Sequence, residues 1–258
     1  MTRTPSQIHG GTPWVVVVIA GVLMAGGCST AKAPSQPSLS VATAASAAAS
    51  PSVEPSPTPA RPRVSKKALN YFFKIALGAE YGGDRIVVKW TKPVVTVRTD
   101  GTVSSASQKC LRKVISDFNA LTATTDLKLT RDSAADVTIH FAPVARFPSL
   151  SPKYVPGNDG FFYAWFNGEH RISSATVLVR TTGISDTLRC DHIRKALTRS
   201  TGLMRESNQY PDSIFYGRHS TTTRYSKLDE QIISLLYSDA IGAGYDQVQV
   251  TSAVQVLP

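Results

Sequence analysis

The stretch that decides the fold covers residues 189–216 and reads RCDHIRKALTRSTGLMRESNQYPDSIFY. Its apolar residues Ile193, Ala196 and Leu197 recur at helical spacing, and Gly202 stands where such a helix would end. This pattern predicts an amphipathic helix with a glycine stop, followed by a tight turn into a buried aromatic segment. An apolar helix face needs a core to pack on, so the rest of the chain must supply one.

The opposite face of the predicted helix is strongly basic. It carries Arg194, Lys195 and Arg199, and Arg205 follows just beyond the stop. We expect these four cations to be on the solvent side of the helix. They form either a binding site or an ordinary solvated surface, and the pattern alone does not separate the two.

The N-terminus has the layout of a bacterial export signal. Residues 1–28 contain Arg3, the apolar run WVVVVIAGVLMAGG and then Cys28. This run is shorter than the roughly 20 residues of a spanning helix. Ala25 and the two glycines before Cys28 resemble a lipobox, although Ala25 replaces the usual leucine. We therefore expect a lipoprotein signal peptide with Cys28 as the lipidated residue, and the alternative is cleavage without lipid.

Residues 29–63 form a segment made almost wholly of Ser, Ala, Pro and Thr. Such a composition buries too little apolar area to offset the entropy of the chain. We expect a disordered tether, kept extended by its prolines, that connects the membrane anchor to one folded domain at residues 64–258. The domain would then be exported and anchored at the outer face of the cytoplasmic membrane.

Hydrophobic periodicity predicts helices and strands in alternation within that domain. Helices are expected at 65–77, 105–121 and 226–240, where Ser226 and Asp229 suggest a capping box, and strands at 85–98 (kinked at Pro93), 126–130, 136–144 and 172–181. Residues 148–171, rich in Pro, Gly and aromatics, favour a hairpin, and the alternative is a loop over a cleft. This order predicts an α+β domain with a mixed, mostly antiparallel sheet packed by helices.

Two cysteines, Cys110 and Cys190, remain in the folded region once Cys28 is assigned to the signal. An exported protein meets an oxidising environment, so we expect these two to form a disulfide. The alternative is a pair of buried free thiols that are too far apart to bond.

No common catalytic motif occurs in the chain. It has no GxSxG elbow, P-loop, GxGxxG, CxxC or HExxH pattern. The histidines of the domain are too dispersed for a helical zinc pair, so we expect no metal and no cofactor. Loose candidates for a nucleophile are Ser200 and Cys190 near His192, and each has a simpler structural explanation.

Several segments together resemble one known family. The matching residues are Arg189-Cys190, Ile193-Arg194, Leu197-Thr198, Gly202-Leu203-Met204, the run YPDSIFY at 210–216, Asp229, and Leu235-Leu236-Tyr237. They look like the core signature of domain-of-unknown-function family 2927, which is found in bacterial secreted proteins. YPDSIFY is the most specific part of the match.

The resemblance implies a zincin-like fold, in which the helix after residue 189 takes the place of the zinc-binding helix. Members of the family usually show Glu-Glu-x-x-Gln there, where zinc peptidases have His-Glu-x-x-His. In this chain the three positions are Lys195, Ala196 and Arg199. Zinc hydrolysis needs neutral imidazole ligands and a carboxylate base, and these side chains supply neither.

Two functions remain as hypotheses. The first is a non-catalytic domain that binds an anionic envelope polymer, peptide or protein through Lys195 and Arg199, one turn apart. Asp191, Glu206 and Asp212 lie near enough in sequence to pair with these cations instead. The second is a non-zinc hydrolase of envelope peptide or glycan that uses Glu206 or Asp212. The net charge of +10 suits anionic surroundings, but scattered basic residues and an export signal argue against nucleic acid.

Overall fold

The computed structural model describes residues 61–79 and 82–257. The expected signal peptide, its Cys28, and the tether up to residue 60 lie outside the described residues. Within the described ranges, none of the helices has the length and apolar character that crossing a membrane requires.

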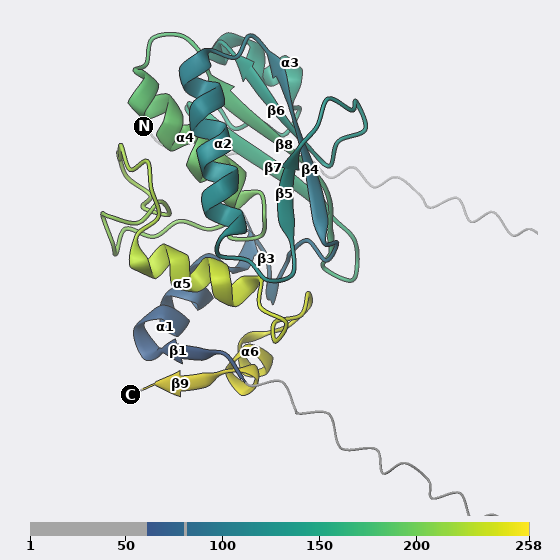
Figure 1. Ribbon diagram of the computed structural model, residues 1–258, viewed down its shortest axis with the longest axis vertical. Coiled ribbons are helices and arrows are strands. Elements are labelled where there is room, and N and C mark those ends of the chain that lie inside the picture. The colour runs from purple at the N-terminus through teal and green to yellow at the C-terminus, as the bar shows by residue number, and fades with distance from the viewer. Residues whose placement is uncertain (1–60, 80–81, 258) are drawn as a thin grey trace, which may run out of the picture. The chain divides into compact units, whose positions relative to one another are not determined.

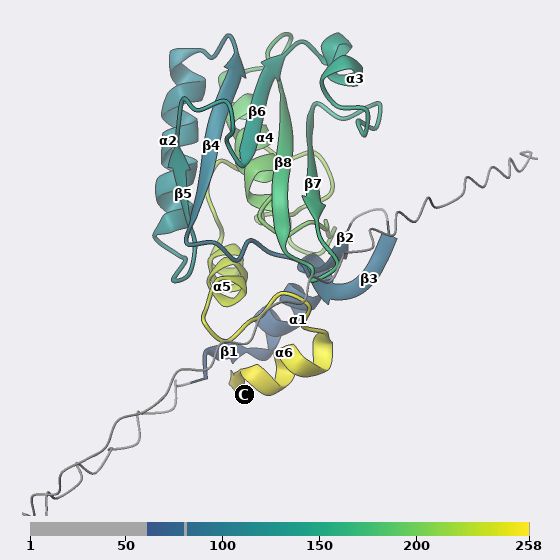
Figure 2. The same cartoon turned by 90° about the vertical axis from the view of Figure 1, so that its right-hand side faces the viewer.

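A five-stranded sheet with the order β5-β4-β6-β8-β7 forms the centre of the domain (Figure 2). Its strands are β4 (Val94–Gly101), β5 (Asp126–Leu129), β6 (Val137–Ala142), β7 (Gly160–Phe166) and β8 (Ile172–Arg180). The α+β class is confirmed, but the prediction of a mostly antiparallel sheet was wrong. The pairs β4/β5, β4/β6 and β6/β8 are parallel, and only β7/β8 is antiparallel. Alternation reports which face a residue occupies and carries no information on strand direction.

Two helices, α2 (Ser105–Asn119) and α4 (Asp186–Arg199), cover one face of this sheet, and Figure 2 shows α4 behind the strands. The apolar residues that alternate along the strands point to these helices and are fully buried, including Val97, Val137 and Val177. The opposite face carries a small second cluster of Phe147, Phe161 and Leu178 at one corner. There the short η1 (Val144–Arg146) and α3 (Phe147–Leu150) lie against it.

The remaining elements extend the core below the sheet (Figure 1). Helix α1 (Lys66–Ile75) packs on α5 (Lys227–Leu236), and strand β1 (Arg63–Ser65) pairs in parallel with β9 (Gln255–Leu257). Strands β2 (Leu77–Ala79) and β3 (Gly82–Val87) form a small antiparallel pair, and α6 (Gln247–Ala253) precedes β9. The sequence patterns did not predict β1, β9, α3 or α6, which are all short.

Most of the longer elements match their predicted ranges. Helices α1, α2 and α5 lie within the predicted segments, and the Ser226–Asp229 capping box is present. The hairpin preferred for residues 148–171 is confirmed in part, because only its first strand, β7, lies in this segment and the second strand is β8.

The disulfide between Cys110 and Cys190 is confirmed, with the two Cα atoms 5.7 Å apart. It joins α2 to α4 across a sequence separation of 80 residues. Closing a loop of this size stabilises the folded state by roughly 4 kcal/mol in the chain-entropy model. Because structural disulfides persist in oxidising compartments, the bond indicates an extracytoplasmic location.

The glycine stop after α4 is a steric requirement. Gly202 has a φ of +117°, and a Cβ at this position would lie 2.1 Å from the carbonyl oxygen of Val88. Only glycine combines this conformation with such close backbone contact. Leu203 and Met204 then enter the core, as the helical pattern predicted.

Candidate functional site

The helix α4 supplies the floor of the candidate site. The side chain of Ser185 caps its first turn by accepting a hydrogen bond from the Leu188 amide. Its predicted apolar face, with Ile193, Ala196 and Leu197, is buried as expected. The sheet and α2 therefore hold the helix on one side, and its other side meets two loops.

One of the four expected surface cations, Arg194, is in the core instead. Its exposed fraction is 0%, its Nη2 donates to Asp117 Oδ2 at 2.7 Å, and its guanidinium carbon lies 4.5 Å from the centre of the Tyr225 ring. The expectation of an exposed Arg194 was wrong because its partner comes from α2, which is distant in sequence. Arg194 is a buried structural ion pair and takes no part in a surface site.

A pocket of about 230 Å³ lies between α4, the loop 157–160 and the segment 216–220. The helix contributes Leu188, Asp191, His192, Lys195, Ala196 and Arg199 to its lining. The loop 157–160 leads directly into β7, so the segment 148–171 supplies one strand of a hairpin and also a wall of a cleft. The pocket thus unites the predicted Lys195 and Arg199 with residues that the sequence patterns did not connect to them.

The ammonium group of Lys195 is held at the pocket with few partners. Its Nζ donates to the carbonyl oxygen of Tyr216 at 2.9 Å and lies 4.0 Å from Asp191 Oδ2. Only 15% of the side chain is exposed. An ammonium has three N–H donors, so two of them have no hydrogen-bond partner among the described residues.

The guanidinium of Arg199, in contrast, makes several contacts within the protein. Its Nε and Nη2 donate to the carbonyl oxygen of Met204 at 3.2 and 2.7 Å, and its Nη1 lies 2.6 Å from Glu206 Oε1. Its carbon is 4.8 Å from the centre of the Phe162 ring. The internal pairing with Glu206 that the sequence allowed is therefore present. Arg199 fixes the turn after α4 and forms part of the pocket wall.

Asp191 is the acid nearest to Lys195. Its side chain is 2% exposed, and the Ser220 hydroxyl lies 3.5 Å from its Oδ1. Burial raises the pKa of this carboxyl to about 6, against the opposing effect of the Lys195 charge. Asp191 is therefore only a weak charge partner for Lys195 in mildly acidic solution.

His192 faces the same pocket from α4. Its Nδ1 is buried and has no hydrogen-bond partner in the described part of the chain. Burial also lowers the pKa of the ring, which favours the neutral imidazole. A Cβ on Gly160 would lie 3.0 Å from His192 Cβ, so the glycine allows β7 to approach the helix closely.

The loose nucleophile candidates from the sequence have structural roles. Cys190 is in the disulfide, and the fully buried Ser200 donates from its Oγ to the Leu197 carbonyl oxygen at 2.7 Å. Glu206 lines the pocket but pairs with Arg199. Asp212 lines a separate hollow with residues 221–226. The geometry does not bring a nucleophile and a free base together at these positions.

The zinc site that the zincin resemblance implies does not fit these residues. Lys195, Ala196 and Arg199 offer no imidazole or carboxylate at the three positions in question, and two of them are cations. Across residues 61–79 and 82–257, no group of three or more His, Cys, Asp or Glu side chains is placed to hold a metal ion.

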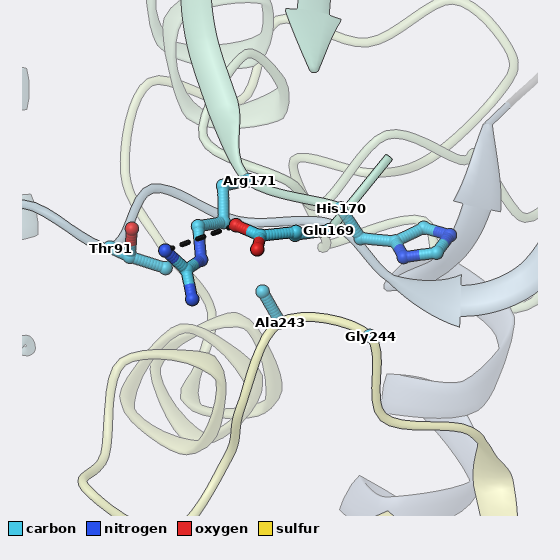
Figure 3. Close-up of a pocket in the computed structure, with 6 residues that line it drawn as sticks. All are labelled: Thr91, Glu169, His170, Arg171, Ala243 and Gly244. Atoms are coloured by element: carbon cyan, nitrogen blue, oxygen red, sulfur yellow. Dashed lines mark ion pairs between the residues drawn. The ribbon is translucent and has the colours of Figure 1, made fainter. Parts of the chain in front are cut away.

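A second, wider hollow of about 620 Å³ lies where the loop before β8 meets the turn after α5 (Figure 3). Arg171 and Glu169 form an ion pair there at 3.2 Å, and His170 points away from it. Both charged side chains are more than half exposed, so water and salt screen the pair. This hollow has no buried polar group that would select a ligand.

Comparison with known protein families identifies the family of this chain. A family model described as "Protein of unknown function (DUF2927)" matches residues 65–256, and this confirms the expected family. No curated protein matches the chain.

The fold of this chain is similar to two solved structures of myroilysin. One has a TM-score of 0.40 at 10% identity, covering 60% of this chain and 97% of the other chain. The second has a TM-score of 0.42 at 12% identity, covering 69% and 98%.

Proposed function

Since this chain belongs to the DUF2927 family of proteins of unknown function, we propose a function from its own pocket: non-catalytic binding of a carboxylate-bearing ligand of the cell envelope. Lys195 is the main contact to the ligand. Arg199 has a positioning role, because its donors are engaged with Met204 and Glu206.

The observation that carries this proposal is the partly buried, incompletely partnered ammonium of Lys195. Its single hydrogen bond goes to a neutral carbonyl oxygen, and its nearest carboxylate is 4.0 Å away. A cation held away from bulk water gains more from an incoming anion than an exposed one does. A ligand carboxylate would supply the charge-assisted hydrogen bonds that Asp191 does not make.

The other charges around the pocket support the same assignment. Asp159 pairs with Arg180 at 2.8 Å, and Glu206 pairs with Arg199 at 2.6 Å. Among the other charged residues that line the pocket, Lys195 and the exposed Arg218 are cations, and Asp191 is the remaining acid. Two cations are thus left against one carboxyl at the pocket, and this charge balance favours a negatively charged ligand.

The size of the pocket limits what enters it. Sites for whole drug-sized ligands usually measure at least about 300 Å³, and this pocket measures about 230 Å³. It suits one terminal or side-chain group of a larger molecule, such as a peptide or an envelope polymer, and the remainder of the ligand stays outside.

The proposal includes an anchored location. Cys28 would carry the lipid, and the segment from residue 29 to residue 60 would hold the domain away from the outer face of the membrane. Lipid on Cys28 adds a diacylglyceryl mass to the mature N-terminus, which mass spectrometry of protein from membranes detects. An unmodified N-terminus beyond Cys28 would remove this part of the proposal without touching the pocket.

Retention on purified cell envelope tests the binding function. Lys195→Met keeps most of the side-chain volume and removes the charge, and we expect retention to fall by about tenfold or more. Lys227→Met is the matched control, because Lys227 is 91% exposed and lies outside the pocket. Unchanged retention of the Lys195 variant, with a wild-type thermal unfolding curve, would remove the proposed function.

A further inference from the structure

The outer face of the five-stranded sheet carries a row of side chains that the pocket does not use. Tyr163, Thr176, Thr138 and Arg98 are successive register partners across β7, β8, β6 and β4. Each is partly exposed, while the residues that alternate with them are packed on the side of α2 and α4. In Figure 2 this face is turned toward the viewer, and α3 lies beside its upper corner.

We propose that this outer sheet face is a second binding site, and that its ligand is an extended acidic glycan. Neighbouring strands lie about 4.8 Å apart, so the row from Tyr163 to Arg98 spans about 14 Å. A chain of linked sugar rings covers such a length without folding. The row offers aromatic, hydroxyl and cationic groups in that order, and each suits one part of an acidic sugar chain.

The aromatic end of the row is a stacking surface. Trp165 is 39% exposed, and its ring meets Tyr163 edge to face at a centroid distance of 4.7 Å. The two residues alternate onto the same face of β7. The C–H face of a sugar ring packs on an exposed aromatic ring, which has a large apolar surface and loses little entropy on binding.

The middle of the row supplies hydrogen-bonding groups. The Thr176 and Thr138 hydroxyls lie between the aromatic end and Arg98. Each hydroxyl both donates and accepts, which matches the hydroxyls of a sugar. Arg98 donates from Nε to Thr138 Oγ1 at 3.1 Å, and this bond holds its guanidinium over the sheet.

Charge complementarity identifies the glycan as acidic. The terminal N–H groups of Arg98 have no hydrogen-bond partner among the described residues, and Lys153 Nζ lies 5.8 Å from the centre of the Tyr163 ring at the other end. Of the nearby acids, Asp136 binds Lys92, and Asp100 binds His140 at 2.7 Å.

The exposed Lys128 adds a further cation, and the exposed Asp126 stands at the edge strand β5. The His140 hydrogen bond and, to a smaller extent, the Arg98 charge lower the pKa of the Asp100 carboxyl, so Asp100 interacts with both residues. The terminal N–H groups of Arg98 nevertheless have no hydrogen-bond partner among the described residues, and such a guanidinium matches a carboxylate of a sugar acid.

Titration calorimetry of the purified full-length protein tests this site with two probes. The first is a hexasaccharide of alternating glucuronate and N-acetylglucosamine, and the second is the neutral hexamer of N-acetylglucosamine. We expect the acidic hexasaccharide to bind more tightly. Trp165→Ala should weaken its binding by about tenfold, while Trp165→Phe retains most of it. Arg98→Gln should weaken it and reduce its dependence on salt.

Three results would overturn the proposal. They are no binding of either hexasaccharide at millimolar concentration, equal binding by wild type and Trp165→Ala, and tighter binding of a single-stranded oligonucleotide than of the acidic hexasaccharide. Lys227→Met is the internal control that must leave glycan binding unchanged, because Lys227 is 91% exposed on α5, away from the outer sheet face. Trp165→Ala and Arg98→Gln test the sheet face, whereas envelope retention of Lys195→Met tests the pocket. Failure of the pocket proposal and failure of this one are therefore separate outcomes.

Discussion

Lys195 and Asp191 lie one turn apart on α4, and the distance between the Lys195 Nζ and the Asp191 Oδ2 is 4.0 Å. Both side chains are largely withdrawn from water, yet they do not form a close ion pair. Burial raises the pKa of the Asp191 carboxyl to about 6. The carboxyl that competes with a ligand for Lys195 is therefore sensitive to mild acid.

The first prediction concerns stability against pH. The folded pKa of Asp191 is raised from the ordinary value of 3.8 to about 6, so the folded state binds more protons between these values. The contribution of Asp191 to the free energy of unfolding is highest below pH 3.8. It falls as the pH rises through 6, by up to about 3 kcal/mol. Asp191→Asn should remove this slope. Urea unfolding at pH 4 and pH 7.5 measures most of it, and equal pH slopes for variant and wild type would contradict the assignment.

The second prediction concerns the buried ion pair. Asp117→Ala would leave the Arg194 charge buried without its carboxylate, which typically costs about 3–5 kcal/mol. Lys113→Gln is the control, because Lys113 is 70% exposed and also contacts Asp117. An exposed helix pair is worth about 0.3–0.5 kcal/mol. If the two variants lost the same stability in chemical denaturation, this result would contradict the buried ion pair between Arg194 and Asp117.

The third prediction concerns the glycine after α4. Gly202→Ala places a Cβ 2.1 Å from the Val88 carbonyl oxygen at a φ of +117°, so the backbone must shift. We expect a loss of several kcal/mol, beyond the usual range for point mutations. Gly168→Ala has no atom within 4 Å of its new Cβ and should be nearly neutral. Melting temperatures of the two variants give the comparison, and a small effect at Gly202 would argue against this close approach.

The fourth prediction concerns the disulfide. Replacing Cys110 and Cys190 together by serine should lower the free energy of unfolding by roughly 4 kcal/mol, because the unfolded chain regains the entropy of an 80-residue loop. Denaturation of the double variant and of wild type, each with and without reductant, measures this loss. A wild-type protein that reductant does not destabilise would contradict the structural role of the bond.

Local patterns predicted the local features well. The apolar spacing of α4, the stop at Gly202 and the capping box at Ser226 each depend on residues within a few positions of one another. The hairpin of β7 and β8 and the helices α1, α2 and α5 were also predictable for this reason. The resemblance to the family located the same helix by its signature.

Long-range pairing could not be read from these patterns. Arg194 is buried because Asp117, on another helix, meets it in the core. The parallel strand pairs and the β1/β9 pair depend on chain crossings that periodicity does not record. The pocket likewise needs residues 157–160, 188–206 and 216–220 together. Sequence reasoning therefore found Lys195 but could not separate its role from that of Arg199.

The most direct test of the central claim is envelope retention of wild type, Lys195→Met and Asp191→Asn between pH 5 and pH 8. If Lys195 binds a ligand carboxylate against competition from Asp191, wild-type retention rises as pH falls through about 6. Asp191→Asn should retain strongly across the whole range, and Lys195→Met weakly at every pH. Retention of Lys195→Met equal to wild type, or a loss of retention in Asp191→Asn, would contradict the account.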